Sequence, residues 1–345
     1  MEDEDYIKRC INLAQKALGD TYPNPMVGSV IVHQGKIIGE GFHHKAGKKH
    51  AEICAIDSVT DGSALKHSTL YVSLEPCSHF GKTPPCAEAL AKIGFRKVVM
   101  GSLDPSEKVH GKGKKILEDS GIEVISGVLE RECRELNKRF FTFHEKKRPY
   151  ILLKWAMSGE GFIDKNGRPY PITSSLVNFF THVLRREEQA ILVGTQTAYI
   201  DNPILTTRNL KGNNPVRLVI DRNLKIPRDY NIYNREAPTI IYNEKVSKTK
   251  GHIEYVLIGK EQSSRDIMKD LYNREIQSVI VEGGSNTIGR FLKDGIWDEA
   301  CVLINENLYL KKGTKAPEIP LFPYLSKNMR NVHVQFFRNP LSNKN

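Results

Sequence analysis

Two cysteines, a histidine and a glutamate are spaced in this chain as in a catalytic zinc centre. The histidine and the glutamate lie in His50-Ala51-Glu52, and the cysteines are Cys77 and Cys86. Three such ligands leave the fourth tetrahedral position of zinc open for water. The metal lowers the pKa of that water toward neutrality, so hydroxide becomes available at pH 7. We therefore expect His50, Cys77 and Cys86 to bind zinc, and Glu52 to carry protons without coordinating the metal.

The distance between the cysteines along the chain points to an unusual substrate. Zinc deaminases that act on nucleobases combine His-x-Glu with Pro-Cys-x-x-Cys. Here Cys86 follows Cys77 by nine positions, and the intervening loop contains His79 and Lys82. A lysine ammonium is a compact cation that suits a phosphate or another anion. The loop therefore predicts a negatively charged substrate beside the metal.

Two other interpretations of these residues remain open at this point. The cysteines and the histidine could be ordinary core residues, although the glutamate and the prolines before both cysteines argue against this. A closed structural zinc site needs a fourth ligand. Cys54 is the candidate, because it follows His50 by one helical turn. It also lies on the apolar stripe of that helix, which favours a small core residue.

Local signals place two of the ligands at helix starts. His50 precedes an apolar-periodic run, and residues 70–74 form an expected strand that ends at Glu75-Pro76. Pro85 precedes Cys86, and proline is tolerated at the start of a helix, where its missing amide hydrogen is not needed. The positive end of a helix favours thiolate over thiol. We therefore expect helices to begin at His50 and at Cys86.

The first 146 residues alternate strands and helices, which predicts a three-layer α/β/α sandwich with a mixed sheet. The segment His33-Gln34-Gly35-Lys36 predicts a hairpin between the first two strands. Asp20, Gly41 and Gly121 mark expected ends of elements. The expected strands are 27–33, 37–42, 69–74, 97–101 and 122–126, and the expected helices are 5–18, 51–60, 86–93, 112–120 and 130–144.

A domain boundary is expected at Lys146-Lys147-Arg148-Pro149, because proline resists continuing the preceding helix. We therefore divide the chain into residues 1–146 and 147–345. In the second part, residues 279–287 predict a strand, a Gly283-Gly284 turn and a helix start. Bare amides at such a start can hold a phosphate, although Gly-Gly turns are also common without one. The expected strands are 150–156, 190–193, 217–220, 239–242, 255–258, 278–281 and 299–304, and the expected helices are 174–186, 264–272 and 285–293.

Composition excludes several classes of protein. The 345 residues are enough for two domains with a core each. Six cysteines at irregular positions favour a reducing cytosol over a disulfide framework, so we expect a cytoplasmic protein. The acidic N-terminus does not resemble a signal peptide. No run approaches the roughly 18 apolar residues of a membrane helix, so we expect no membrane partner.

The net charge of +11 suggests nucleic acid, but its distribution along the chain does not. Residues 1–145 contain 20 Lys and Arg and 20 Asp and Glu, so the excess lies wholly in the second part. A deaminase of tRNA or DNA would place its basic surface beside the zinc. A basic second part suits a phosphorylated metabolite and a phosphate-rich cofactor, or simply a solvated surface. We therefore expect no nucleic-acid partner.

The first part resembles the bifunctional deaminase–reductase family of riboflavin biosynthesis. The resemblance rests on residues 21–28, on His50-Ala51-Glu52 and on the segment from Glu75 to Cys86 with its Gly-Lys-Thr-Pro-Pro sequence. It continues through Asp104-Pro105 and covers nearly the full chain. General cytidine and tRNA adenosine deaminases have a shorter loop between the cysteines. The resemblance implies a zinc site at His50, Cys77 and Cys86, a proton shuttle at Glu52, and substrate contacts from Asn24, His43, His79 and Lys82.

The second part resembles the reductase half of the same family, through residues 201–208, 215–217 and 281–285. That half has a fold similar to dihydrofolate reductase, so the lack of Gly-x-Gly-x-x-Gly is no objection. The resemblance implies catalytic roles for Lys154 and Asp201, with Arg222 suited to the extra phosphate of NADPH. Implied substrate contacts are Arg185, Leu205, Arg208 and Glu282. Implied cofactor contacts are Ala156, Thr197, Asp201, Arg222, Gly284, Ser285, Asn286 and Thr287.

The resemblance has departures in one loop of the second part. The family commonly has Ser-Leu-Asp-Gly where this chain has residues 158–161 as Ser-Gly-Glu-Gly. The usual Trp-Ile-Thr is replaced by Pro171-Ile172-Thr173. Because this loop ordinarily borders cofactor and substrate, the family's contacts from residues 159–171 are not transferred.

The resemblance implies two consecutive reactions with Zn²⁺ and NADPH as cofactors. The first is hydrolytic deamination of 2,5-diamino-6-(5-phosphoribosylamino)pyrimidin-4(3H)-one, and the second is reduction of its ribosyl group to a ribityl chain. We expect the protein to bind this phosphorylated pyrimidine as its substrate. We also expect it to form a homo-oligomer. Two rivals are a nucleic-acid or free-base deaminase with a non-enzymatic second domain, and a zinc-stabilised metabolite-binding module without turnover.

Overall fold

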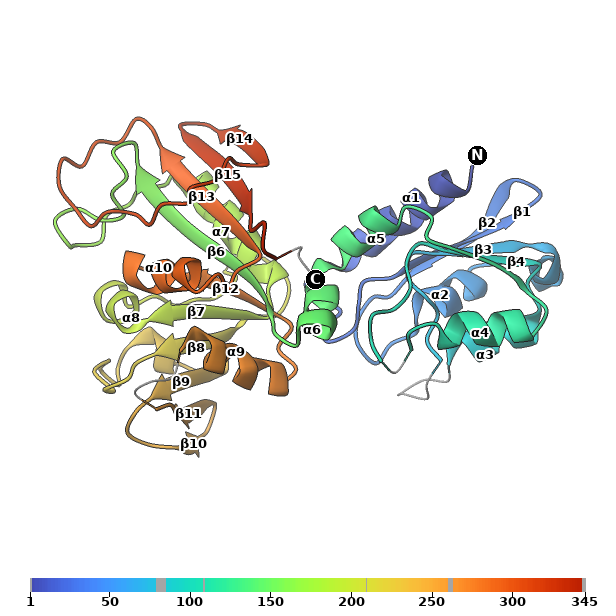
Figure 1. Ribbon diagram of the computed structural model, residues 1–345, viewed down its shortest axis with the longest axis horizontal. Coiled ribbons are helices and arrows are strands. Elements are labelled where there is room, and N and C mark those ends of the chain that lie inside the picture. Colours follow the sequence, from blue (N-terminus) through green and yellow to red (C-terminus); the bar gives the residue numbers. More distant parts are fainter. Residues whose placement is uncertain (1, 79–84, 108, 209, 260–262, 343–345) are drawn as a thin grey trace. The chain divides into compact units, whose positions relative to one another are not determined.

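The computed structural model describes residues 2–78, 85–107, 109–208, 210–259 and 263–342 (Figure 1). The chain divides into two compact units, Met1–Lys147 and Arg148–Asn345. The division falls one residue after the end expected for the first domain, next to the Lys-Lys-Arg-Pro segment.

A mixed sheet forms the centre of the first unit. In the described residues it has five strands, in the order β2-β1-β3-β4-β5. Strand β1 is antiparallel to both of its neighbours, whereas β3, β4 and β5 are parallel. The expected hairpin is confirmed, with Gln34 and Gly35 at the positive φ values that suit a two-residue turn. The strands are β1 (Gly28–His33), β2 (Lys36–Phe42), β3 (Thr69–Val72), β4 (Lys97–Met100) and β5 (Glu123–Ser126).

Helices cover both faces of this sheet, so the expected three layers are confirmed (Figure 1). Successive strand residues point to opposite faces. Val30 therefore packs with α1 and α5, whereas Ile31 packs with α2, α3 and α4. The helices are α1 (Asp3–Ala14), α2 (Ala51–Asp57), α3 (Cys86–Ile93), α4 (Lys112–Asp119), α5 (Glu130–Leu136) and α6 (Lys138–Lys146), with 3₁₀ turns η1 (Gln15–Ala17) and η2 (Gly62–His67).

The single helix expected over residues 130–144 is instead two helices, α5 and α6, separated at Asn137. The Asn137 side chain is buried. Its Oδ1 accepts from the Met26 amide and its Nδ2 donates to the Met26 carbonyl, both at 2.8 Å. These two bonds tie the helix junction to a segment far away in sequence, which a local pattern does not reveal.

Gly41 lies inside β2 and not at its end, which corrects its expected role. A Cβ atom at this position would lie 2.4 Å from the Ala55 amide nitrogen in α2. Glycine therefore lets α2, the helix that carries Glu52, pack directly on the sheet.

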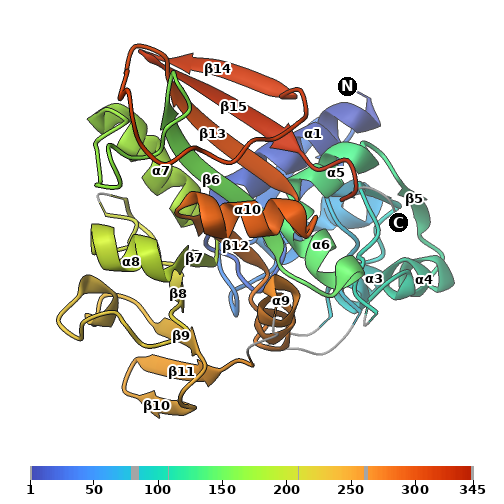
Figure 2. The same cartoon turned by 60° about the vertical axis from the view of Figure 1, so that its left-hand side comes forward.

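The second unit contains a larger sheet, with ten strands in the described residues in the order β10-β11-β9-β8-β7-β12-β6-β13-β15-β14. The strands from β11 to β13 in this order are parallel, and antiparallel pairs close both edges (Figure 2). The bounds are β6 (Tyr150–Ser158), β7 (Ala190–Gly194), β8 (Val216–Ile220), β9 (Thr239–Asn243), β10 (Lys248–Lys250), β11 (Ile253–Leu257), β12 (Ser278–Glu282), β13 (Glu299–Asn305), β14 (Leu325–Met329) and β15 (Val332–Arg338).

Helices again cover both faces of this sheet. Met268 of α9 and Phe291 of α10 belong to one apolar cluster, whereas Val177 of α7 and Ala198 of α8 belong to the cluster on the other face. The bounds are α7 (Ser175–Glu187), α8 (Thr195–Asp201), α9 (Ser264–Asn273), α10 (Ser285–Lys293) and η3 (Asn231–Tyr233). None of the helices in the described ranges is long and apolar enough to cross a membrane.

Four elements, α8, β10, β14 and β15, were not expected from the sequence. β10 and β14 are largely exposed and polar, so they lack the apolar alternation that indicates a strand. α8 has only seven residues. These elements form because neighbouring strands and turns of the folded chain hold them.

Candidate active sites

The three predicted zinc ligands meet at one point in the first unit. His50 Nδ1 lies 3.5 Å from Cys77 Sγ and 3.3 Å from Cys86 Sγ. The three ligand atoms all lie within 4.8 Å of one another. Tetrahedral zinc, with bonds of about 2.3 Å to sulfur and about 2.1 Å to nitrogen, separates its ligands by roughly 3.5–3.8 Å. The donor set and its spacing therefore fit one zinc ion with a fourth position for water.

Helix starts hold two of these ligands, as expected. His50 is the N-cap of α2, and Cys86 is the first residue of α3. The Cys86 amide donates to Cys77 Sγ at 3.3 Å, which puts the Cys77 sulfur at the positive end of α3. Hydrogen bonds from Cys86 and His50, opposed by burial, lower the pKa of Cys77 well below that of a free thiol. The site therefore favours the thiolate, the form that binds metal.

Glu52 lies in the first turn of α2 and is only 3% exposed. Burial, together with the negative charge of Cys77, raises the pKa of the Glu52 carboxyl to about 7. A carboxyl group with such a pKa can both accept and release a proton at neutral pH, which is what general acid–base catalysis needs.

Cys54 lies outside the metal-capable cluster found in the described part of the chain. Its sulfur contacts the Lys49 carbonyl at 3.8 Å, and the residue is half-buried. The closed site with Cys54 as fourth ligand therefore has no support in this geometry.

Asn24 and His43 lie together beside the metal ligands. His43 is buried, and its ring stands edge-on to the His50 ring at a centroid distance of 5.2 Å. Asn24 Nδ2 lies 3.0 Å from His43 Nε2. The other two predicted substrate contacts of this unit, His79 and Lys82, lie outside the described residues.

Glu75 is a residue of this site that the sequence analysis passed over. Its buried carboxylate accepts hydrogen bonds from the amides of Asp104, Gly111 and Lys114 at 3.1, 2.9 and 3.1 Å. These bonds anchor the strand end from which Pro76 and Cys77 continue. The only sequence signal was its position directly before Pro-Cys.

A buried group of charges forms the centre of the second unit. Glu282 on β12 is in register with Lys154 on β6, and Glu282 Oε2 lies 4.0 Å from Lys154 Nζ. Arg185 on α7 donates from Nε and Nη2 to the two Glu282 oxygens, both at 2.8 Å. Burial opposes ionisation of Glu282, but the charges of Arg185 and Lys154 lower its pKa to about 2. Two donor nitrogens of the Arg185 guanidinium are therefore already bound to a carboxylate of the protein.

Two adjoining cavities lie in this unit, and the first of them borders this group. One has a volume of about 420 Å³ and includes Lys154, Arg185 and Glu282 in its lining. The other has a volume of about 560 Å³, and both share Asp164, Thr197 and Gly284. These volumes are typical of ligand sites. The first cavity also contains the predicted residues Ala156, Thr197, Asp201, Leu205 and Gly284, and the second contains Thr197, Arg222, Gly284, Ser285, Asn286 and Thr287.

Asp201 lies at the wall of the first cavity, beyond the centre formed by Lys154. Partial burial there and the nearby charge of Asp164 raise the pKa of the Asp201 carboxyl. Asp164, Arg168 and Tyr170 come from the loop that departs from the family pattern, and they also line this cavity. Arg208 is exposed and, in the described chain, lies outside the linings of both cavities.

The start of α10 has the form of a phosphate site. Gly284 is the N-cap, with no side-chain cap hydrogen bond, and its amide donates to Thr197 Oγ1 at 2.9 Å. Gly283 has a φ of 150°, which favours glycine. A Cβ atom on Gly194 would lie 2.4 Å from Thr287 Oγ1, so glycine lets the two turns approach. Uncapped amides beside a cavity suit an anionic cofactor.

Comparisons with known proteins match a family to each part of the chain. The family described as the cytidine and deoxycytidylate deaminase zinc-binding region matches residues 1–102, and the RibD C-terminal domain family matches residues 149–307. The riboflavin biosynthesis protein RibD of Aquifex aeolicus is 45% identical over 309 residues, which cover 88% of this chain and 86% of that protein. RibD of Escherichia coli is 34% identical over 357 residues, covering 95% and 93%.

Solved structures give the same result. A diaminohydroxyphosphoribosylaminopyrimidine deaminase/5-amino-6-(5-phosphoribosylamino)uracil reductase from Thermotoga maritima has a TM-score of 0.89 at 35% identity and covers 98% of both chains. RibD from Acinetobacter baumannii has a TM-score of 0.87 at 29% identity, covering 97% of this chain and 98% of that one.

Fold and sites thus define a bifunctional enzyme, a zinc-binding deaminase joined to a reductase. More particularly, the chain belongs to the RibD family of riboflavin biosynthesis.

Proposed function

We propose that the first unit deaminates 2,5-diamino-6-(5-phosphoribosylamino)pyrimidin-4(3H)-one and that the second reduces the ribosyl group of the product to ribityl phosphate. The observation that carries this proposal is the convergence of His50, Cys77 and Cys86 beside the buried Glu52 carboxyl. The name of the Thermotoga relative contains both activities, which supports the choice of substrate.

In the first reaction, His50, Cys77 and Cys86 would hold zinc, which when bound supplies a water of lowered pKa. Glu52 takes a proton from the attacking water and delivers a proton to the departing amino group. Its pKa of about 7 suits both transfers. Asn24 binds a polar edge of the substrate. His79 and Lys82 are assigned to the ribose phosphate on the resemblance alone.

In the second reaction, the turn at Gly284 and the start of α10 would hold NADPH, which when bound would supply the hydride for C1′ of the ribosyl group as the sugar ring opens. Lys154 faces the first cavity, where its ammonium can donate to the ring oxygen as that oxygen gains charge. Burial lowers the Lys154 pKa although Glu282 opposes this, so proton release becomes easier. Arg185 and Glu282 hold Lys154 in place, and Leu205 and Asp201 line the same cavity.

We assign one reaction to each unit, deamination to residues 1–147 and reduction to residues 148–345. We also assign the enzyme to the cytosol and to a homo-oligomeric state. Free cysteines support the first assignment, and the exposed Leu176 and Phe179 of α7 support the second. Sedimentation of the purified enzyme measures the oligomeric state.

A coupled assay on the purified enzyme tests the proposal. The phosphoribosyl pyrimidine should yield one ammonia and then consume one NADPH, whereas cytidine and tRNA should yield no ammonia. Ammonia release from cytidine or tRNA would favour a nucleobase deaminase. Bound zinc without any ammonia release would favour a binding module.

A further inference from the structure

In the described residues, the second cavity of the reductase unit is lined by three cations, namely Arg222, Lys225 and Arg290. Arg222 and Lys225 follow β8, and Arg290 lies on α10. NADPH differs from NADH only by a phosphate on the adenosine 2′-oxygen. The contacts of these three side chains decide which of them are available to that phosphate.

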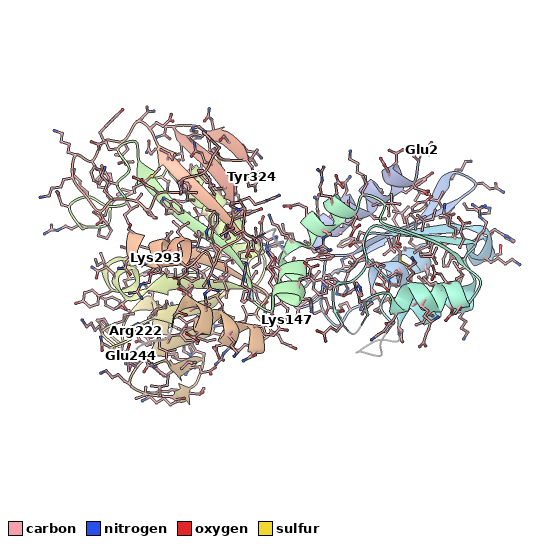
Figure 3. The ribbon with its side chains drawn as sticks, in the orientation of Figure 1. Glu2, Lys147, Arg222, Glu244, Lys293 and Tyr324 are labelled. Carbon is pink, nitrogen blue, oxygen red and sulfur yellow. The ribbon has the colours of Figure 1, made fainter. Side chains whose placement is uncertain are left out.

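Arg222 is already paired with a carboxylate. Its Nη1 donates to Glu244 Oε1 at 2.6 Å and to the Gly259 carbonyl at 3.4 Å. Glu244 follows β9, the parallel neighbour of β8, and Figure 3 shows the two labelled side chains adjacent. Both side chains are partly buried, with 27% and 17% exposed. The Arg222–Glu244 ion pair has no net charge, so it attracts a phosphate less than a free arginine would. The Glu244 carboxylate would also repel the phosphate.

Lys225 and Arg290 are in a different situation. Both are exposed at the cavity, and in the described part of the chain neither side chain forms an ion pair. The acidic residues of the same lining are engaged elsewhere. Asp221 accepts from the amides of Lys225 and Ile226, and Asp164 accepts from those of Gly167 and Thr314.

The lining of the second cavity also indicates how a bound cofactor would be oriented. The uncapped start of α10, at Ser285, suits the pyrophosphate. The nicotinamide must reach the adjoining cavity with Lys154, on the side where both cavities share Asp164 and Thr197. The adenosine is therefore directed to the part of the lining that the first cavity does not share, which contains Lys225, Ser264 and Arg290.

We propose that Lys225 and Arg290, and not Arg222, bind the 2′-phosphate of NADPH and set the preference for NADPH over NADH. The proposal rests on NADPH occupying this cavity. A ribose 2′-phosphate is close to a dianion at pH 7, so two unpaired cations match its charge. The arginine can also donate two parallel hydrogen bonds to its oxygens.

Calorimetric binding to the full-length enzyme tests this assignment without turnover. The probes are 2′,5′-ADP, which carries the 2′-phosphate, and ADP, which carries a pyrophosphate and lacks it. Arg290→Ala and Lys225→Ala should each weaken 2′,5′-ADP by about 10- to 100-fold, the scale of a charge-assisted hydrogen bond. Both should leave ADP binding unchanged. In kinetics, the KM for NADPH should rise and that for NADH should not.

Lys293→Ala is the matched control, because Lys293 is an exposed cation on the same helix and outside the cavity lining (Figure 3). It should change neither affinity, and Arg222→Ala should change 2′,5′-ADP binding less than Arg290→Ala. Ammonia release and tryptophan fluorescence check that each variant is folded. The proposal fails if Arg222→Ala alone removes the preference for 2′,5′-ADP, or if Arg290→Ala and Lys225→Ala weaken both probes equally. A wild-type enzyme that releases ammonia and binds neither probe would instead contradict the cofactor site itself.

Discussion

His43 accepts a hydrogen bond from Asn24 through its Nε2 atom. Its other ring nitrogen, Nδ1, lies 3.1 Å from the Lys49 carbonyl oxygen, which can only accept, so Nδ1 carries the hydrogen. Burial also lowers the His43 pKa, which keeps the ring neutral. Asn24 must therefore turn its NH₂ group toward His43 at 3.0 Å, which leaves its carbonyl oxygen as the acceptor of the side chain. His43 acts as a positioning residue for Asn24.

His43→Ala should therefore raise the deaminase KM by about 2- to 12-fold, the value of one neutral hydrogen bond, with a smaller change in kcat. His43→Gln keeps an acceptor near Asn24 and should restore part of the loss. Steady-state ammonia release measures both constants, and zinc content controls for damage to His50. If the alanine and glutamine variants were indistinguishable, the positioning role would be refuted.

Glu52→Gln keeps the size of the side chain and removes its proton transfer. Ammonia release should fall by about 10²- to 10⁴-fold, the usual contribution of a general acid–base. Zinc content, measured by atomic absorption, should stay the same. Cys86→Ser is the contrasting variant, because it should lose both metal and activity. Near-normal activity in Glu52→Gln would exclude the assigned proton path.

Gly284→Val tests the cofactor site without disturbing the fold. A Cβ atom on Gly284 would lie 3.7 Å from Thr197 Oγ1, an ordinary contact, so the added side chain would extend into the shared wall of both cavities. The KM for NADPH should rise strongly or hydride transfer should stop, with ammonia release unchanged. Gly289→Ala is the control on α10, because a Cβ atom there has no neighbour within 4 Å. Normal NADPH oxidation in Gly284→Val would place the cofactor elsewhere.

Glu282→Gln should destabilise the second unit by about 3–5 kcal/mol at pH 7, because it leaves Arg185 without its buried partner. The folded-state pKa of Glu282 is about 2, below the value of roughly 4.3 in an unfolded chain. Its stabilising contribution is therefore full above about pH 5 and is lost as the pH falls toward 2. The stability difference between wild type and variant should shrink over that range.

Urea unfolding followed by tryptophan fluorescence measures this difference. Both tryptophans of the chain, Trp155 and Trp297, lie in the second unit, so the signal reports that unit. If the stability difference between wild type and variant stayed constant from pH 7 to pH 3, the neighbours of Glu282 would not lower its pKa in the folded protein.

Residues 1–147 expressed alone should fold, bind zinc and release ammonia without consuming NADPH. Each apolar cluster of the described chain contains residues from one unit only, so the first unit has apolar cores of its own. Circular dichroism and the ammonia assay check the fragment. An unfolded fragment would mean that the two units depend on each other for stability.

The zinc site could be predicted almost completely from the sequence. Its local features have direct chemical meaning: the types of the ligands, the two-residue step from His50 to Glu52, and the proline before Cys86. The alternation of apolar residues predicted most strands of both sheets. The exposed strands β10 and β14 and the break at Asn137 depend on partners elsewhere in the chain, so a local pattern contains no signal for them. β15 was missed although Val332 and Val334 alternate as buried residues.

The sequence by itself therefore determined the chemistry of this protein, because metal ligands and glycine turns are defined by residues that are close along the chain. The tertiary structure alone decided which charges remain available to ligands. Arg185 is paired with Glu282, 97 positions away, and Arg222 is paired with Glu244, 22 positions away. An arginine has the same intrinsic charge wherever it stands, but its capacity to bind a phosphate depends on whether folding has brought a carboxylate beside it.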